Sequence, residues 1–268
     1  MDGTGAVKNK SPNETLPRHV GIIMDGNGRW ALNKGIARTS GHTEGLKTAR
    51  RIVETASLRG IRYLTLFVFS TENWKRASRE VDFIMSLVKQ HLTRELDFYR
   101  KNHIRIRHTG DITGLAPDII AEIDEARADT KDFDGMQVIL ALNYGGRNAI
   151  VRAARRYLQN LPNVSCAEAA DTLDENILSN NLDNPDLPDP DLIIRTAGEF
   201  RTSNFLLWEA AYAEYFITDK FWPDFSNEDF DAALAAYAAR ERRFGAATAG
   251  SGGKFGRRSN PRGEPVNQ

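Results

Sequence analysis

The chain has 268 residues, of which 41% are apolar and 27% charged, enough for one globular domain or two small ones. The 36 basic and 36 acidic residues cancel, so we expect neither wholesale disorder nor a nucleic-acid partner. The single cysteine, Cys166, excludes an intramolecular disulfide and a cysteine-based zinc cluster and fits a reducing compartment. No apolar stretch approaches the roughly 20 residues that span a bilayer, and no signal-peptide pattern is visible. We therefore expect a cytoplasmic protein.

The two ends differ in composition from the middle of the chain. Residues 1–17 are polar and lack periodicity, which predicts a flexible N-terminal arm. Residues 246–268 are rich in glycine, arginine and proline, which predicts a disordered basic tail. An anionic membrane surface could attract this tail, or the tail could simply aid solubility. Residues 18–245 are expected to form a single domain.

Within that domain, apolar runs alternate with helical patterns. In chain order, the expected elements are a strand at 19–25, a helix at 41–59, a strand at 63–70, a helix at 78–102, a strand at 104–110, a helix at 117–128, a strand at 136–143, helices at 147–159 and 166–179, strands at 191–196 and 214–218, and a helix at 227–242. This order predicts an α/β fold with a mainly parallel sheet of about six strands flanked by helices. In such sheets, ligands lie beyond the carboxyl ends of the strands.

The first group of polar residues follows the first expected strand. Asp25 ends the strand, and Gly26 and Gly28 form a tight turn that leads into a helix with Arg29. Backbone N–H groups at such a turn bind anions, and a nearby carboxylate can hold a divalent cation against a phosphate. The alternative is an ordinary βα turn with a capping aspartate. Asn27 stands where an aspartyl-phosphate phosphatase would need a second aspartate.

Two further groups could meet the same ligand. Arg38, Gly41 and His42 lie one short helix downstream of that turn, although surface or structural roles are the alternative. The segment from Ser70 to Arg76 (STENWKR) follows the second expected strand. This segment carries hydroxyl, carboxyl, amide, indole and cationic side chains, which are seldom buried together in a core. It therefore predicts a binding loop. A capped, solvated loop is the alternative.

A fourth group follows the fifth expected strand. Arg195 ends that strand, and Arg201 and Ser203 lie where the next helix is expected to begin. Burying two arginines without anionic partners would cost several kcal/mol, so these residues predict a second anion site unless a carboxylate such as Glu199 pairs with them. Glu214 is a nearby candidate metal ligand. The helix expected at 78–102 either packs simply on the sheet or forms one wall of a slot for an apolar substrate.

On these residues the chain resembles the cis-prenyltransferases, the undecaprenyl diphosphate synthase family. The matching stretches are MDGNGRWA (24–31), GH (41–42), FSTENWKR (69–76), LNYGGR (142–147), IRTAGEFRTSNFLLWEAAYAEYFITDKFWPDF (194–225) and RERRFG (240–245). They occur in order at compatible spacing. The resemblance implies a homodimeric, Mg²⁺-dependent isoprenyl transferase that extends an allylic diphosphate, commonly farnesyl diphosphate, with isopentenyl diphosphate.

The resemblance also assigns roles to residues. Asp25 would be the essential carboxylate and would hold Mg²⁺ with Glu214. Asn73 is the family's proposed proton acceptor, although an amide is a weak base and we expect it to orient a diphosphate or water. The substrate-binding residues would be Gly26, Asn27, Gly28, Arg29, Trp30, Arg38 and His42 at the allylic diphosphate, Ser70, Thr71, Glu72, Trp74 and Arg76 in the closing loop, and Arg195, Arg201, Thr202 and Ser203 at isopentenyl diphosphate.

The resemblance also leads to an expectation for the length of the product. An apolar tunnel would set it, with Val68, Ile104 and Met136 along its wall and floor, and none of these is bulky enough to indicate a short product. We therefore expect a product near C55, undecaprenyl diphosphate for a cell-wall glycan lipid carrier, with transient contact at the inner face of the membrane through this lipid. The alternatives are a short-chain synthase, a catalytically silent partner subunit, or a nucleotide-binding domain. Ala197 departs from the family's usual glycine.

Overall fold

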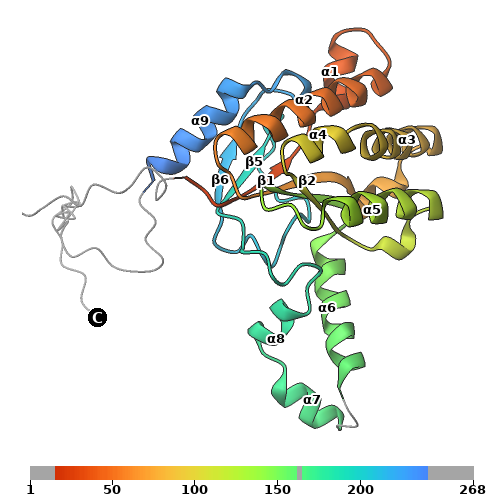
Figure 1. Cartoon of the computed structure of the whole chain (residues 1–268), viewed down its shortest axis with the longest axis vertical. Helices are drawn as coiled ribbons and strands as arrows, with labels where there is room; N and C mark the ends of the chain where they lie inside the picture. Colours follow the sequence, from red (N-terminus) through yellow and green to blue (C-terminus); the bar gives the residue numbers. More distant parts are fainter. Residues whose placement is uncertain (1–15, 162–164, 241–268) are drawn as a thin grey trace, which may run out of the picture. The chain divides into compact units, whose positions relative to one another are not determined.

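The computed structural model describes residues 16–161 and 165–240, and its larger compact unit ends at Ala238. The strands are β1 (His19–Ile23), β2 (Tyr63–Ser70), β3 (Arg105–Thr109), β4 (Gln137–Tyr144), β5 (Leu192–Arg195) and β6 (Glu214–Ile217). They form one sheet in the order β3-β4-β2-β1-β5-β6, in which every neighbouring pair is parallel. The predicted α/β class and six-stranded parallel sheet are confirmed (Figure 1).

The helices match the predicted ones with a few differences. They are α1 (Asn27–Asn33), α2 (Arg38–Leu58), α3 (Ser78–Arg94), α4 (Leu96–Lys101), α5 (Pro117–Thr130), α6 (Gly146–Asn160), α7 (Cys166–Thr172), α8 (Glu175–Asn180) and α9 (Asn227–Ala238). The helix predicted at 78–102 is divided into α3 and α4 at Glu95. The helix predicted at 166–179 is also two helices, because the Asp174 side chain accepts a hydrogen bond from the Ile177 N–H and starts α8 afresh.

Short 3-10 helices occupy three of the connections: η2 (Thr71–Lys75), η3 (Ile112–Gly114) and η4 (Trp222–Asp224). The predicted binding loop at 70–76 therefore has regular structure. The predicted N-terminal arm and basic tail fall almost wholly outside the described residues, although Leu16 packs against the core. Within the described part of the chain, no helix combines the length and apolar character needed to cross a membrane.

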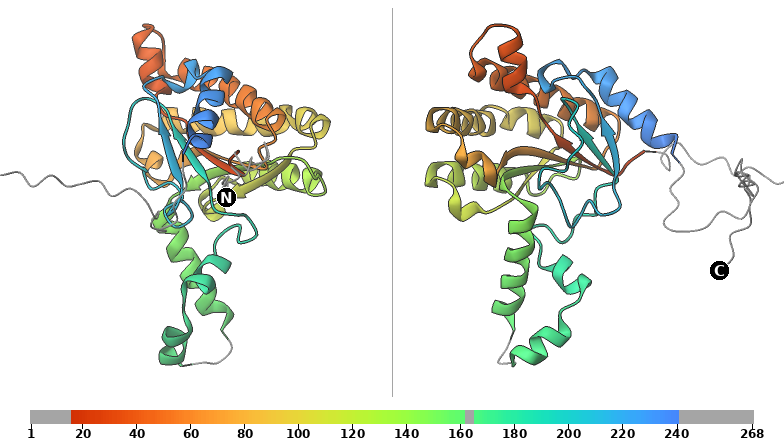
Figure 2. Two further views of the ribbon diagram at one scale, coloured as in Figure 1. Left: turned by 90° about the vertical axis from the view of Figure 1, so that its left-hand side faces the viewer. Right: turned by 180° about the vertical axis from the view of Figure 1, so that it is seen from behind.

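Both faces of the sheet are buried, and this explains the continuous apolar runs in its strands. Val20 and Ile22 face the larger cluster, which contains residues of α2, α3, α5 and α9. Ile23, one residue further, packs on the opposite face with Phe205 and Leu206, as the two-residue period of a strand requires. In Figure 2, α6, α7 and α8 form an arm that projects from the sheet.

The strand register brings the predicted polar groups to one edge of the sheet. Ile23 at the end of β1 lies beside Phe67 of β2 and beside Arg195 at the end of β5. Asp25, Ser70 and the segment after Arg195 therefore emerge from the same carboxyl edge, as predicted for the ligand site of a parallel sheet.

Candidate active site

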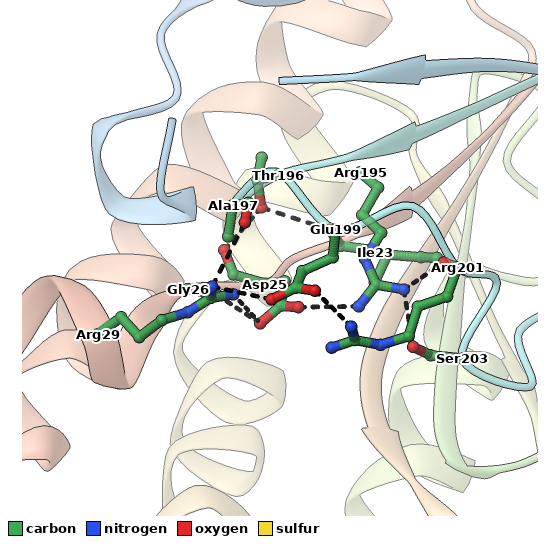
Figure 3. Close-up of polar contacts among 10 residues, drawn as sticks. All are labelled: Ile23, Asp25, Gly26, Arg29, Arg195, Thr196, Ala197, Glu199, Arg201 and Ser203. Atoms are coloured by element: carbon green, nitrogen blue, oxygen red, sulfur yellow. Dashed lines mark hydrogen bonds and ion pairs between the residues drawn. The ribbon is translucent and has the colours of Figure 1, made fainter. Parts of the chain in front are cut away.

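Asp25 lies at the centre of the polar contacts at this edge (Figure 3). Its Oδ1 accepts a hydrogen bond of 2.7 Å from the Gly26 N–H, and its Oδ2 accepts one of 2.9 Å from Nη2 of Arg195. Nη2 of Arg29 is 3.4 Å from Oδ1. Gly26 adopts φ 103°, a left-handed conformation that suits glycine and turns the chain from β1 into α1. These contacts fix the carboxylate while 29% of its side chain stays exposed.

Arg195 is buried, with 3% of its side chain exposed. Besides Asp25, its guanidinium donates to the hydroxyl of Ser203 at 2.7 Å and to the backbone carbonyl of Arg201. Its Nε is buried and has no hydrogen-bond partner among the described residues. The predicted cluster of Arg195, Arg201 and Ser203 is therefore assembled in the structure.

Glu199 links the two predicted anion sites. Its Oε1 accepts a hydrogen bond of 2.9 Å from Arg29, and its other carboxylate oxygen pairs with Arg201. The alternative considered from sequence, that Glu199 pairs with Arg195 and Arg201, therefore holds for Arg201 only, because the carboxylate partner of Arg195 is Asp25. Arg29 and Arg201 remain partly exposed, so the anion site stays a prediction.

Two residues of the second predicted group, Arg38 and His42, lie beside α1 and, with Asn27, form a polar cradle. Gly28 lets the Arg38 guanidinium approach, because an added Cβ would lie 2.9 Å from its Nη2. Asn27 Oδ1 is buried without a hydrogen-bond partner among the described residues. Arg38, Asn27 and His42 line a small polar pocket of about 120 Å³ with Asp25, Arg29 and Arg76.

Glu80 of α3 connects this cradle to the closing loop. It accepts hydrogen bonds from Nη1 of Arg76 at 2.9 Å and from Nε2 of His42 at 3.3 Å. Burial lowers the pKa of His42 below its ordinary value, against the opposing effect of Glu80. The pKa of Glu80 is also lowered, because Arg76 and His42 outweigh the effect of burial.

Hydrogen bonds within the closing loop (residues 70–76) and to neighbouring segments hold it in place. Oδ1 of Asn73 accepts from the Ser70 N–H at 3.2 Å, and the Trp74 indole donates to Asn143 at 2.7 Å. Glu72 accepts from the Asn204 amide at 2.9 Å, which ties the loop to the segment after β5. Because its amide oxygen caps η2, Asn73 has its NH₂ group left to meet a ligand, which agrees with an orienting role.

Two cavities meet at this site. The polar cavity has a volume of about 580 Å³ and is lined by Asp25, Ser70, Glu72, Asn73, Arg76, Arg195, Arg201 and Ser203, among others. The apolar pocket has a volume of about 110 Å³ and lies among side chains of α2, α3 and β2. Both cavities share lining residues, including Val68, Phe67 and Ile84. A phosphorylated head and an apolar tail could therefore occupy adjoining spaces.

Three predicted site residues, Trp30, Thr71 and Thr202, line neither these cavities nor the small polar pocket. Trp30 is buried, and its indole donates to Asp224 at 2.7 Å, a contact that ties α1 to η4. The Thr71 hydroxyl packs against Gly145, and the Thr202 carbonyl accepts from the Phe205 N–H. Ile104 and Met136 are buried in the core and precede β3 and β4, at the opposite edge of the sheet from Asp25. Their place along the wall and floor of a tunnel stays a prediction.

Glu214 is also separated from Asp25 within one chain. It pairs with Leu192 at the start of β5 and β6, whereas Arg195, which contacts Asp25, pairs with Ile217. Three residues of strand correspond to about 10 Å. The chain therefore does not bring these two carboxylates together by itself, and their joint metal role stays a prediction.

Sequence reasoning missed Asn143 and Asn204, which hold Trp74 and Glu72. Both adopt positive φ, 51° and 64°, which asparagine tolerates better than most residues. These asparagines lie in LNYGGR and RTSNF, segments that resemble the family, and no periodicity of the sequence marks them. The role of Glu80 was not predicted, because the sequence pattern of its helix indicates a solvent-exposed face at that position.

The site fits Mg²⁺ in one of its usual modes. This ion commonly binds one or two carboxylates and completes its shell with phosphate oxygens and water. Asp25 offers such a carboxylate, and the polar cavity has room for a diphosphate. Across residues 16–161 and 165–240, no three His, Cys, Asp or Glu side chains are grouped to hold a metal, so the protein alone does not provide a closed metal cage.

Comparisons with known proteins identify the family of this chain. The family model described as "Putative undecaprenyl diphosphate synthase" matches residues 23–245. The isoprenyl transferase of Treponema denticola is 46% identical over 228 residues, 85% of this chain and 97% of that protein. That of Thermotoga maritima is 46% identical over 230 residues, 86% and 97% of the two chains.

Solved structures give the same result. Lavandulyl diphosphate synthase from Lavandula x intermedia, crystallised with dimethylallyl diphosphate, superposes with a TM-score of 0.80 at 35% identity and covers 87% of this chain and 99% of that one. A probable undecaprenyl diphosphate synthase from Campylobacter jejuni gives 0.71 at 34%, covering 85% and 98%. The chain therefore belongs to the undecaprenyl diphosphate synthase family of isoprenyl transferases.

Proposed function

We propose that the protein condenses isopentenyl diphosphate units onto an allylic diphosphate, starting from farnesyl diphosphate, and releases a long Z-polyprenyl diphosphate, undecaprenyl diphosphate. The observation that carries this proposal is the junction of the two cavities. Asp25 and several arginines line one cavity, and aliphatic side chains line the other, so a diphosphate and its prenyl tail each meet a suitable surface. The solved neighbour that binds dimethylallyl diphosphate supports an allylic ligand.

The allylic diphosphate is assigned to the cradle of Arg29, Arg38 and His42 beside Asp25. As the allylic C–O bond breaks, negative charge increases on the leaving diphosphate. Positive groups already in place there bind the transition state more strongly than the substrate. Mg²⁺ held by Asp25 would supply further charge stabilisation of the leaving group.

Isopentenyl diphosphate is assigned to Arg201, Ser203 and Arg195. The ion pair between Arg195 and Asp25 joins this position to the allylic one, so the two substrates would lie side by side. Holding both reactants removes most of the entropic cost of bringing them together. Asn73, with its amide oxygen engaged by Ser70, would orient a diphosphate or water through its NH₂ group.

We also propose that the active protein is a homodimer. Val151 and Leu158 are 47% and 58% exposed, and their spacing of seven residues places them on one face of α6, which a second subunit could cover. A partner subunit would also offer a second Glu214 to a metal site. Contact with the inner face of the membrane would follow from release of the lipid product, which would serve as a carrier for cell-wall glycan.

The test incubates the purified protein with farnesyl diphosphate, radiolabelled isopentenyl diphosphate and Mg²⁺ and resolves the products by chain length. We expect a ladder that ends near C55. A ladder that stops at C20, after a single condensation, would replace the long-chain assignment with a short-chain synthase. Absence of product with several allylic primers and added detergent would favour a silent partner subunit.

A further inference from the structure

A histidine interrupts the aliphatic face that α3 presents to the apolar pocket. Ile84, Leu87, Val88 and His91 all line this pocket, and their spacing of three and four residues places them on one face of the helix. His91 also lines a separate outer groove of about 150 Å³, whose other walls include Lys47, Gln90 and Arg94. His91 therefore lies where the pocket meets the groove.

The lining residues define a direction through the pocket. Val68 and Ile84 belong to both the polar cavity and the apolar pocket, whereas His91 and Leu46 belong to both the pocket and the outer groove. Val88 lies between these two ends on α3. A prenyl chain with its diphosphate in the polar cavity would pass Val68 and Ile84 first and would reach His91 last.

Tyr99 of α4 holds the imidazole in place. Its hydroxyl and Nε2 of His91 share a hydrogen bond of 2.5 Å, and the two rings are 5.9 Å apart in an edge-to-face arrangement. Burial lowers the pKa of His91 to about 4, so the ring is neutral at physiological pH. Without Tyr99, a buried ring nitrogen would lose a hydrogen-bond partner at a cost in free energy.

We propose that His91, positioned by Tyr99, closes the outer end of the apolar pocket and thereby limits the length of prenyl chain that the enzyme makes. This inference rests on the proposed function, which places the prenyl chain in this pocket. A chain that grows past His91 must displace the imidazole and break its hydrogen bond to Tyr99, whereas aliphatic walls nearer the polar cavity need only repack.

The test compares the products of the wild-type protein and of His91→Val, His91→Ala and Tyr99→Phe, made from farnesyl and isopentenyl diphosphates with Mg²⁺. Mass spectrometry gives the chain lengths. We expect His91→Ala to lengthen the longest product by one or more isoprene units and His91→Val to lengthen it less. Tyr99→Phe keeps the imidazole but removes its hydrogen-bond partner. The ring should then move aside more easily, and the product distribution should broaden toward longer chains.

Gln90→Ala is the matched control, because Gln90 is exposed, adjoins His91 and lines only the outer groove. It should leave the product ladder unchanged. If the two His91 variants fold, complete the first condensation and still give the wild-type ladder, the inference is overturned while the proposed function stands. If the wild-type protein makes no prenyl product, the proposed function fails, and the two failures are thus distinguished.

Discussion

Asp25 and Arg195 lie 170 residues apart in the sequence and 2.9 Å apart in space, at the ends of adjacent parallel strands. The Arg195 side chain is nearly inaccessible to solvent, whereas Asp25 is partly exposed and faces the polar cavity. A buried guanidinium needs an anionic partner, and Asp25 provides it from the same carboxylate that faces the substrate cavity. The carboxyl group proposed for catalysis is therefore also the partner of a buried arginine.

Replacing Asp25 should lower both turnover and stability. Asp25→Ala removes the carboxylate at the leaving diphosphate, so we expect turnover to fall by at least about 10²-fold. It also leaves Arg195 without an anionic partner, and the free energy of unfolding should fall by roughly 1–3 kcal/mol. Product assays and urea denaturation measure the two effects.

Asp25→Asn is the matched control for this experiment. The Gly26 N–H and Arg195 bond to different oxygens of Asp25, so the single amide oxygen of asparagine can keep only one of these hydrogen bonds. The variant should therefore lose turnover while retaining more stability than the alanine variant, which keeps neither. If Asp25→Ala kept substantial turnover in Mg²⁺, the carboxylate would be misassigned.

Val68 should influence product length, because it lines both the polar cavity and the apolar pocket. Val68→Leu adds a methylene group where the two spaces meet, and we expect a shift of the product ladder toward shorter chains. Ile123→Leu is the control. Ile123 lies in the core and lines neither cavity, and this near-isosteric change should cost less than about 1.5 kcal/mol and leave the ladder unchanged. A ladder unaltered by Val68→Leu would place Val68 outside the path of the chain.

The arrangement of the sheet and the site was largely predictable from sequence. Continuous apolar runs marked the strands, and a parallel sheet places the residues that follow its strands at one edge. Asp25 and Arg195 were predicted on that basis before any contact was known. The pattern could not tell which residues after a strand face the ligand. Trp30 of α1 is an example, since its indole donates a hydrogen bond to Asp224 instead.

Other parts could not be predicted because long-range contacts decide them. Glu199 could have been a solvated side chain, and only the fold brings Arg29 to it. The division of the helix predicted at 78–102 likewise has no glycine or proline to mark it.

Acid should destabilise the protein through His19. Its Nδ1 lies 2.7 Å from the Pro188 carbonyl, which only accepts, so Nδ1–H is the donor and Nε2 accepts from Thr65. Burial lowers the pKa of His19 from 6.5 to about 4. Between about pH 6.5 and 4, the His19 ring is therefore protonated in the unfolded chain but not in the folded chain. Consequently the free energy of unfolding falls as the pH falls through this range. At pH 5 the loss is on the order of 2 kcal/mol.

Comparison with His19→Gln isolates this effect. The variant loses hydrogen bonds and should be less stable than the wild type at pH 7, but the difference in unfolding free energy should narrow between pH 6.5 and 4. A difference that stays constant over this range, measured by chemical denaturation at each pH, would contradict the assignment. Nitrogen NMR should show a neutral His19 ring at pH 5.

Ala197 adopts φ 70°, a conformation in which its methyl group is strained. Two hydrogen bonds hold the turn there, from the Ala197 N–H to the Lys220 carbonyl at 2.7 Å and from the Gly198 N–H to the Thr218 carbonyl at 2.9 Å. The left-handed conformation costs roughly 1–2 kcal/mol for a residue other than glycine, and the greater freedom of glycine in the unfolded chain offsets about 0.4–1 kcal/mol of that. We therefore expect Ala197→Gly to raise the free energy of unfolding by up to about 1 kcal/mol.

Activity should survive this change, because the Ala197 carbonyl that meets Arg29 is retained. Ala153→Gly is the matched control, since the same chemical change in the interior of α6 should lower stability by about 1 kcal/mol. Urea denaturation of the two variants should thus give shifts of opposite sign. If both variants lost stability equally, the packing of the Ala197 methyl against the turn at Gly26 would outweigh its strain, and the departure from the family's glycine would be a stabilising one.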